Sequence, residues 1–135
     1  MASRLNPYLS FKDNARQAME FYQSILGGEL NLSTFGDFGN PDPAVADQVM
    51  HGQLETPAGY TLMAADTPPE NDYVAEANNA VSLSGDDVDD LRGYFAGLSD
   101  GGTVLVPLEK QMWGDEFGMV TDKFGIRWLV NITQA

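Results

Sequence analysis

An internal repeat constrains the fold of this chain more than any other feature of its sequence. A constant offset of 74 residues aligns three features of the two halves: Leu9 with Leu83, Phe21 with Phe95, and Gly27-Gly28 with Gly101-Gly102. Further along, the offset becomes 66 and aligns Gly59 with Gly125, because a loop in the second half is eight residues shorter. Neither half is large enough to bury a sheet face alone, so the two halves are expected to pair in one domain.

Each half predicts the order strand, helix, strand, strand, strand. In the first half, apolar residues at helical spacing run from Ala15 to Leu26 and end at two glycines. Asn14 and Gln17 are placed to form a capping box at the start of this helix. The strands of this half are predicted at residues 5–11, 30–35, 48–56 and 60–65, with a loop at 36–47.

The second half repeats this pattern. A helix is predicted at residues 86–98, with Asp86 as its N-cap and with further aspartates in its first turn. The strands are predicted at 80–84, 103–108, near 117–121 and at 126–132. We therefore predict an α+β fold of two βαβββ modules, at about 1–66 and 79–135, joined by a linker at 67–78 within a single domain, 1–135.

Composition excludes several kinds of partner. The formal net charge is −13, and seven basic residues scattered along the chain cannot form a phosphate-binding patch, so no nucleic acid partner is expected. No apolar run approaches the length that spans a bilayer, and the N-terminus lacks the apolar core of a signal peptide. We therefore expect no membrane association and a cytoplasmic location. The absence of cysteine excludes disulfides, thiolate metal sites and a cysteine nucleophile.

His51 is the single histidine of the chain and lies on the predicted third strand. Strand alternation places it on one face with Val49, Gln53 and Glu55. Two interpretations stay open for His51, a group that contacts a ligand or reacts in a pocket, and a structural histidine of the sheet. A single histidine without a partner is weak evidence for general-base catalysis.

Aromatic residues and glycines gather between Trp113 and Trp128. Aromatic walls with a few polar groups are typical of small-molecule pockets, although turn glycines and core packing explain at least half of these residues. The segment from Asp122 to Gly125 is predicted to be a turn between two strands. Asp115 and Glu116 adjoin glycines in a predicted loop, and nothing in the pattern favours a catalytic role for them.

Several segments together resemble the PhnB-like proteins of the glyoxalase/bleomycin-resistance/dioxygenase (vicinal oxygen chelate) superfamily. The resemblance extends over nearly the whole chain and rests on these segments: residues 6–11, 18–22, 26–28, 49–51, 64–66, 113–118 and 122–128. It implies that the two βαβββ modules form a cupped, incomplete barrel. It also implies a homodimer.

The resemblance further implies where a divalent metal would bind, with one ligand from the first and one from the last strand of each module. This chain has Pro7 or Tyr8, Met63 or Ala64, Asn79 or Ala80, and Trp128 or Leu129 at those places. These side chains are poor metal ligands, so no metal is expected at the standard site. No glycine-rich loop for S-adenosylmethionine follows the first strand, and no cofactor is expected.

Three functions remain in competition, and the weakest of them is a purely structural or regulatory dimer with a vestigial pocket. The first is the binding of a small molecule, apolar or aromatic, by these residues: Tyr8, His51, Met63, Asp66, Trp113, Phe117, Met119 and Trp128. The second is a lyase, isomerase or dioxygenase activity that uses His51 together with Asp66 or Tyr8. The sequence favours binding over catalysis, because the metal ligands are missing and the histidine stands alone.

Overall fold

The chain divides into two compact modules in the computed structural model, an N-terminal module (Met1–Ala75) and a C-terminal module (Glu76–Ala135). The structure describes residues 6–39, 42–43, 45–67 and 80–133. Apart from Thr67, the predicted linker lies outside these residues. The elements of the N-terminal module are β1 (Tyr8–Phe11), α1 (Ala15–Leu26), β2 (Glu29–Thr34), the 3₁₀ helix η1 (Gly36–Phe38), β3 (Val49–Glu55) and β4 (Thr61–Asp66). Those of the C-terminal module are β5 (Val81–Gly85), α2 (Val88–Ser99), β6 (Thr103–Lys110), β7 (Glu116–Thr121) and β8 (Arg127–Ile132).

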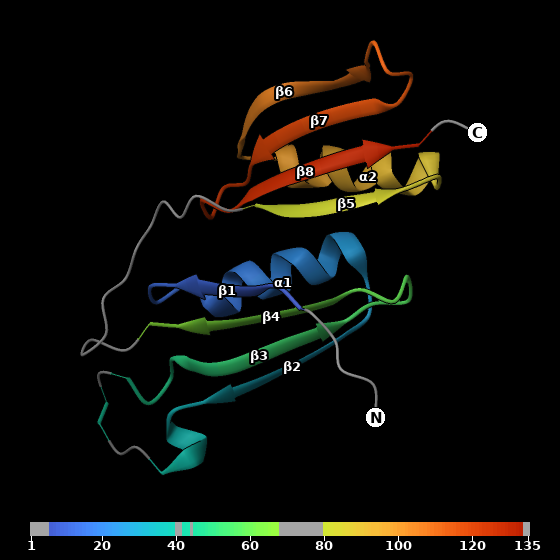
Figure 1. The fold of residues 1–135 in the computed structure, drawn as a ribbon. Coiled ribbons are helices and arrows are strands. Elements are labelled where there is room, and N and C mark those ends of the chain that lie inside the picture. Colours follow the sequence, from blue (N-terminus) through green and yellow to red (C-terminus); the bar gives the residue numbers. More distant parts are fainter. Residues whose placement is uncertain (1–5, 40–41, 44, 68–79, 134–135) are drawn as a thin grey trace. The chain divides into compact units, whose positions relative to one another are not determined.

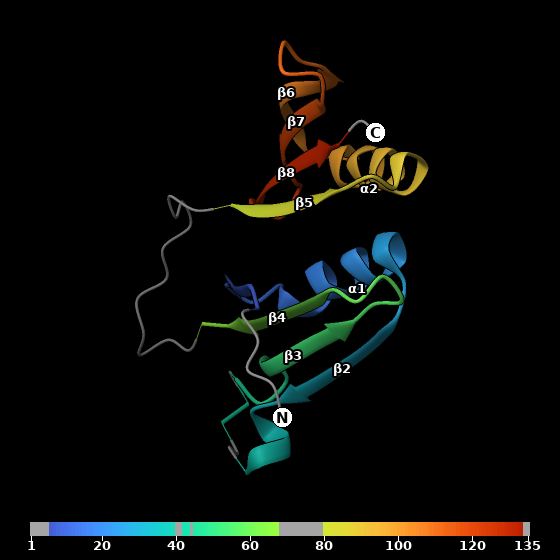
Figure 2. The ribbon, with the colours of Figure 1, turned by 45° about the vertical axis from the view of Figure 1, so that its right-hand side comes forward.

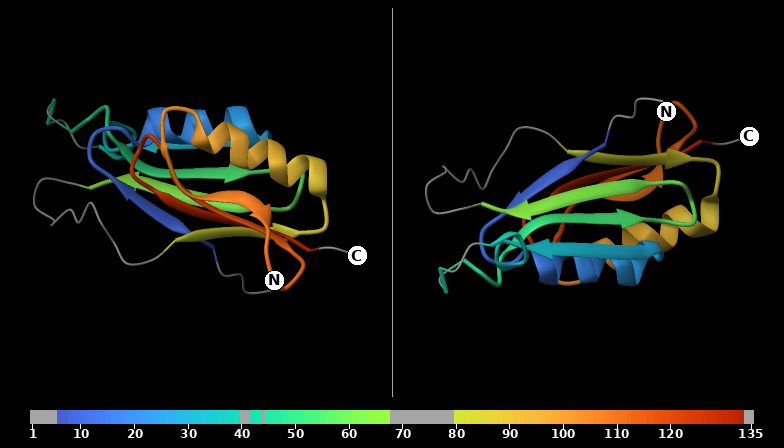
Figure 3. Two further views of the ribbon diagram at one scale, coloured as in Figure 1. Left: turned by 90° about the horizontal axis from the view of Figure 1, so that it is seen from above. Right: turned by 90° about the horizontal axis from the view of Figure 1, so that it is seen from below.

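Each module contains one four-stranded sheet of the same topology. The strand order is β1-β4-β3-β2 in the N-terminal module and β5-β8-β7-β6 in the C-terminal module (Figure 1). In both sheets the first and last strands of the module are parallel neighbours, and the remaining pairs are antiparallel. Figure 3 shows the four strands of the N-terminal sheet side by side. The predicted α+β fold of two βαβββ modules is therefore confirmed.

The strand registers of the two modules correspond residue by residue. Tyr8 lies opposite Met63 in the N-terminal module, and Ser82 lies opposite Leu129 in the C-terminal module. These pairs differ by the offsets of 74 and 66 that the repeat showed in the sequence. The structure thus supports the repeat at the level of hydrogen-bonded strand pairs.

One face of each sheet packs against the helix of its own module (Figure 2). In the N-terminal module the fully buried side chains of α1 include Met19 and Tyr22, and Leu54 and Ala64 of the sheet are equally buried. In the C-terminal module the core includes Leu91 and Leu98 of α2 and these strand residues: Val120, Trp128, Val130 and Ile132. Burial of this apolar surface is the main force that holds each helix to its sheet.

Within the described residues of each module, no helix of that module packs on the opposite face of its sheet, and we call this face the helix-free face. Gly52 of β3 faces the helix side, since it lies opposite fully buried Ala64 and two residues before fully buried Leu54. Gly118 of β7 also faces that side, because its Cβ would lie 2.8 Å from Phe95 Cε2 on α2. The neighbours of these glycines along each strand therefore belong to the helix-free face.

Some local predictions were wrong. The loop predicted at 36–47 contains η1, and α2 begins after Asp87 instead of Asp86. Asn14 does occupy the N-cap of α1, but its side chain makes no capping hydrogen bond. The predicted capping box with Gln17 is absent from this helix start, because a carboxylate from a distant strand occupies the place of the cap. No helix among the described residues is long and apolar enough to cross a membrane.

Candidate functional site

The helix-free face of the N-terminal module brings three of the predicted site residues together. Met63 of β4 lies between Tyr8 of β1 and Gln53 of β3 in the strand register. The rings of Tyr8 and His51 lie with centroids 6.1 Å apart and planes tilted by 42°. Tyr8 is 53% exposed, and Met63 and His51 are half-buried. This face therefore presents an aromatic pair beside a flexible thioether.

His51 makes no hydrogen bond within the described part of the chain, and its ring contact is with Tyr8. A catalytic histidine usually has a hydrogen-bonded partner that fixes its tautomer and raises its basicity. The geometry around His51 therefore offers an aromatic and polar contact surface, and Tyr8 is the residue whose ring contacts that of His51.

Next along this face lies a set of hydrogen-bonded polar side chains. Gln53 Nε2 donates to Glu55 Oε1 at 2.6 Å, and Thr61 Oγ1 donates to Glu55 Oε2 at 2.8 Å. These contacts hold the Glu55 carboxylate in one orientation on the sheet. Polar groups with fixed orientation supply the directional part of small-molecule recognition.

Val49 does not share this face, contrary to the prediction. The pairing of β2 with β3 shifts register between Ser33 and Thr34, so that Ser33 lies opposite His51 and Thr34 opposite Val49. This bulge adds one residue to β3 and moves Val49 to the helix side, where its side chain lies 3.7 Å from a Cβ built on Gly52. Val49 is accordingly buried.

Asp66, another predicted site residue, has a structural role. Its Oδ1 accepts a hydrogen bond from the backbone N–H of Ala15 at 2.9 Å, and its Oδ2 accepts one from the N–H of Val49, also at 2.9 Å. Asp66 is 3% exposed. The carboxylate caps the N-terminus of α1 and ties it to the start of β3, so we leave Asp66 out of the proposed site.

The helix-free face of the C-terminal module carries Phe117 and Met119, which are half-buried. The ring of Trp113 stands edge-on to Phe117, with centroids 6.2 Å apart and planes at 61°. Trp113 is 61% exposed and lies in the connection between β6 and β7. Two hydrogen bonds close this connection, from Gln111 N to Asp115 O at 2.8 Å and from Gly114 N to Gln111 O at 3.0 Å.

Trp128 lies on the opposite side of β8, in the core. Its side chain is 0% exposed, and its indole Nε1–H donates to Asp122 Oδ2 at 2.9 Å. Asp122 Oδ1 accepts from the backbone N–H groups of Phe124 and Ile126, which confirms the predicted turn. Trp128 therefore packs in the core, as one of the two interpretations of the aromatic residues expected, and we leave it out of the proposed site.

We expect the replacement Asp122→Asn to lower the free energy of unfolding by about 2 kcal/mol, because the new amide cannot accept all three of these buried hydrogen bonds. Urea denaturation followed by circular dichroism measures this change. Near-ultraviolet dichroism, which reports Trp128, should change as well. An unaltered midpoint would contradict the structural role of Asp122.

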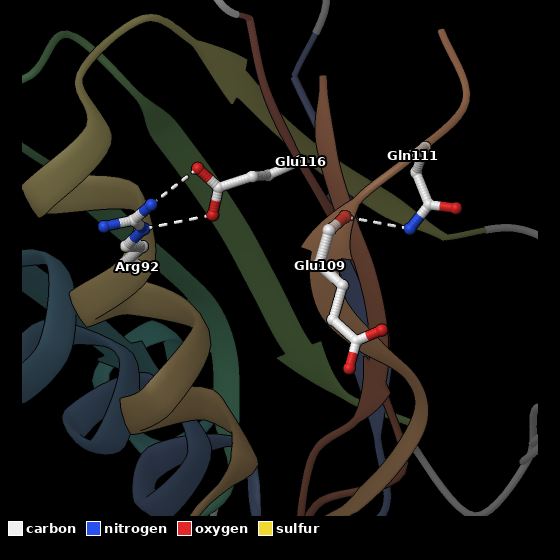
Figure 4. Close-up of polar contacts among 4 residues, drawn as sticks. All are labelled: Arg92, Glu109, Gln111 and Glu116. Carbon is white, nitrogen blue, oxygen red and sulfur yellow. Dashed lines mark hydrogen bonds and ion pairs between the residues drawn. The ribbon is translucent and has the colours of Figure 1, made fainter. Parts of the chain in front are cut away.

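Glu116 and Asp115, adjacent in the sequence, have different contacts. Glu116 forms a two-pronged ion pair with Arg92 of α2, at 3.0 Å to Nε and 2.7 Å to Nη2 (Figure 4). The hydrogen bonding to Glu116 and the negative charge of its carboxylate raise the pKa of Arg92. Figure 4 also shows Gln111 donating to the backbone oxygen of Glu109 at 2.8 Å. These contacts join α2 to β7 and close the end of β6.

Asp115 contacts the helix-free face instead. Its Oδ2 accepts a hydrogen bond from Asn131 Nδ2 at 3.1 Å, and the strand register places Asn131 directly opposite Phe117. The sequence interpretation missed Asn131. Strand alternation would have found it, because it lies two residues beyond Leu129 on the same face of β8.

The family resemblance implies metal ligands on the first and last strands of each module. Two strand pairs related by the repeat lie at these places, Tyr8 with Met63 and Ser82 with Leu129. The sequence interpretation named Asn79 or Ala80 for the start of the second module. Asn79 lies outside the described residues, and the repeat partner of Tyr8 is Ser82. None of the four residues is a carboxylate or an imidazole, and no group of three or more histidine, aspartate or glutamate side chains in the described ranges could hold a metal ion.

Comparison with known proteins gives consistent matches. The model of the Glyoxalase/Bleomycin resistance protein/Dioxygenase superfamily matches residues 4–130. Protein YjdN of Escherichia coli K12 is 29% identical in an alignment 146 positions long, which covers 96% of this chain and 95% of YjdN. Protein PA1353 of Pseudomonas aeruginosa has a similar structure, with 36% identity, a TM-score of 0.89, and coverage of 99% of this chain and 100% of PA1353. A Bacillus cereus protein called a putative 3-demethylubiquinone-9 3-methyltransferase, PhnB protein, superposes with a TM-score of 0.78 at 20% identity over 97% of this chain and 100% of its own, which shows the shared fold alone.

Proposed function

Because this chain belongs to the glyoxalase/bleomycin resistance/dioxygenase superfamily, we propose that it binds an apolar or aromatic small molecule without the help of a metal ion. The observation that carries the proposal is the kind of side chain on the helix-free faces. Tyr8, His51 and Met63 are partly exposed on one sheet, and Phe117 and Met119 on the other. Aromatic and thioether groups of this kind are the usual lining of small-molecule sites.

The residue pairs also have the geometry that aromatic ligands use. Tyr8 with His51 and Trp113 with Phe117 are tilted or edge-on pairs, with ring centroids near 6 Å. A ligand ring can extend either pair in the same manner, and each good ring contact adds about 0.5–1.5 kcal/mol beyond the area that it buries. Methionine adapts its shape to such a ring.

Binding can be tested with a panel of neutral aromatic probes, from indole to 2-naphthol, by NMR of the ¹⁵N-labelled full-length chain. We expect at least one probe to shift the indole signal of Trp113, while the signal of Trp128 stays in place because its N–H is bonded to Asp122 in the core. The two tryptophans thus report the two sides of one sheet. If no probe at millimolar concentration moves Trp113 or the backbone amide signals of Tyr8, His51 and Met63, the proposal is wrong.

The replacement Phe117→Ala is expected to weaken binding of such a probe about tenfold, which corresponds to about 1.4 kcal/mol for a lost ring contact. Val104→Ala is the matched control, because Val104 is also partly exposed, at 44%, but pairs with buried Val120 on the helix side of the sheet. The control should bind like the unaltered protein. Equal losses in both variants would point to a general loss of structure.

Metal independence has its own test. The four side chains at the standard metal positions supply at most weak oxygen ligands, which do not favour a tightly bound divalent ion. We expect protein purified without added metal to contain far less than one equivalent of nickel, zinc, manganese or iron, and EDTA to leave probe affinity unchanged. Stoichiometric metal in such preparations would contradict this part of the proposal.

An enzymatic function through His51 is the second candidate, and the contact between His51 and Tyr8 is the observation that favours it. In a lyase, isomerase or dioxygenase of this kind, His51 would accept a proton and the Tyr8 hydroxyl would orient the substrate. If a turnover is found, His51→Ala should abolish it while the unfolding midpoint stays the same. Unchanged turnover would exclude His51 as the catalytic group.

A homodimer and a cytoplasmic location belong to the same proposal, as the family resemblance and the sequence suggest. Light scattering coupled to size-exclusion chromatography should give twice the mass of one 14.7 kDa chain. A mass equal to a single chain at micromolar concentration would exclude a stable dimer.

A further inference from the structure

The contact between Asp115 and Asn131 fixes a hydrogen-bond acceptor beside the aromatic residues of the C-terminal module. Asn131 lies on β8, half-buried, on the helix-free face. Its Nδ2 donates to Asp115 Oδ2 at 3.1 Å. Within the described residues, no hydrogen bond is made to Asn131 Oδ1, and the half-buried side chain of Asn131 is partly exposed on this face.

The orientation of this amide follows from the chemistry of its partner. A carboxylate only accepts hydrogen bonds, so the atom of Asn131 that faces Asp115 must be the NH₂ group. The carbonyl oxygen must then occupy the other position of the amide plane. Asp115 thereby removes the ambiguity that an asparagine side chain ordinarily has.

An aromatic residue lies beside Asn131 on the neighbouring strand. Phe117 is the antiparallel register partner of Asn131, so their side chains are direct cross-strand neighbours on one face. Trp113 stands edge-on to Phe117. The same hairpin connection carries both Trp113 and Asp115, so one short segment supplies a ring and orients the acceptor.

We propose that Asn131 Oδ1 selects ligands that carry an N–H or O–H donor on an aromatic ring, with Asp115 as the positioning residue. This inference rests on the proposed function and adds a ligand class to it. The ring would contact Phe117 and Trp113, and its donor would reach the Asn131 oxygen. A site that offers a fixed acceptor discriminates against an analogue without the donor, because the polar group is then left unpaired.

Indole and 1-methylindole form a matched probe pair, since they share one ring system and differ in the N–H donor. Their dissociation constants can be measured by NMR titration of the full-length chain. For the unaltered protein we expect indole to bind about tenfold more tightly than 1-methylindole, which is the discrimination that one good hydrogen bond supplies. Similar affinities for the two probes would overturn the inference and leave the proposed function standing. If neither of these probes binds while another aromatic probe of the panel does, this inference fails and the proposed function stands; if no probe of the panel binds, both fail.

Three variants separate the roles of the residues. Asn131→Leu removes the acceptor at similar size, so indole should bind about tenfold more weakly and 1-methylindole about equally well. Phe117→Leu should weaken both probes to a similar extent, because it removes the ring and keeps the acceptor. Asp115→Asn is the decisive variant. An asparagine at position 115 can donate a hydrogen bond to Asn131 Oδ1, and the NH₂ group of Asn131 then turns toward the ligand.

For Asp115→Asn we therefore expect the preference for indole over 1-methylindole to fall from about tenfold to about twofold. A purely structural role of Asp115 would weaken both probes and leave their ratio unchanged, and that result would contradict the positioning role. Circular dichroism at the start of each titration verifies that every variant is folded. Retention of the tenfold preference in Asn131→Leu would exclude Asn131 as the selecting acceptor.

Discussion

Gly28→Ala is expected to lower the free energy of unfolding by about 4 kcal/mol, the sum of a left-handed backbone cost and of overpacking against a rigid neighbour. Gly28 has a φ of +98°, and a Cβ atom there would lie 2.0 Å from the carbonyl oxygen of Glu55. This oxygen belongs to the backbone at the end of β3 and cannot rotate away. Urea denaturation measures the change, and a loss below about 1 kcal/mol would contradict the close approach.

Two other glycines provide the scale for this prediction. Gly102, the repeat partner of Gly28, lacks the positive φ, but its Cβ would lie 2.4 Å from the carbonyl oxygen of Thr121. Gly59 has a φ of +92° and no atom within 4 Å of its Cβ. We expect the alanine variants to be destabilised in the order Gly28, Gly102, Gly59, with about 1 kcal/mol for Gly59. Equal losses at Gly59 and Gly28, whose φ values are similar, would show that backbone conformation alone decides the effect.

Asp66→Ala is expected to destabilise the protein by about 3 kcal/mol, because it leaves two buried backbone N–H groups, of Ala15 and Val49, without an acceptor. The free energy of unfolding from urea titration measures this loss. The N-terminus of α1 should also exchange its amide protons faster in the variant, since the cap no longer holds its first turn. Equal exchange rates with and without Asp66 would contradict the capping role.

Asp66→Asn should cost about half as much, since the amide keeps one acceptor oxygen and turns an NH₂ group toward the other N–H. Asp47→Ala serves as the control. Asp47 is an exposed aspartate in the segment that precedes β3, and its replacement should change stability by less than about 0.5 kcal/mol. A comparable loss in this control would mean that net charge, and not the cap, determines the effect.

Most of the fold could be predicted because the repeat and the local patterns agreed. Gly27 and Gly101 have φ values of +76° and +77°, as the predicted helix stops require. The strand pairs at Tyr8 and Ser82 follow the two offsets of the repeat. These features depend on residues that are close in the sequence or related by the duplication, so the chain displays them directly.

Other features could not be predicted because they depend on residues that are distant in the sequence. Asn14 matched the capping pattern, but the cap of α1 comes from Asp66, 51 residues away from the N–H that it accepts. The sequence of β3 alone does not predict the bulge that turns Val49 toward the helix, because a bulge depends on how the strand pairs with its neighbour. Secondary-structure propensity depends on short segments of the sequence, so it does not predict contacts between distant residues.

The candidate site was predicted in part for the same reason. Aromatic content singled out Trp128 and Trp113 alike, yet one is 0% and the other 61% exposed. Trp128 occupies a core-facing position of β8, whereas Trp113 lies in the connection between β6 and β7, and the pattern of the sequence does not give strand bounds to the residue. Asn131 was missed because nothing in the sequence indicates its hydrogen bond with Asp115, which lies 16 residues away.

The alternation along β3 and β8 has a consequence for how such a protein changes over many generations. In β8, and in β3 beyond its bulge, every second side chain is buried in the core, and under the proposed function the side chains between them contact the ligand. Selection for a new ligand can therefore replace one set while the other keeps the chain folded. A saturation-mutagenesis map of each strand should show tolerance with a period of two, and new specificities should arise at the tolerant positions.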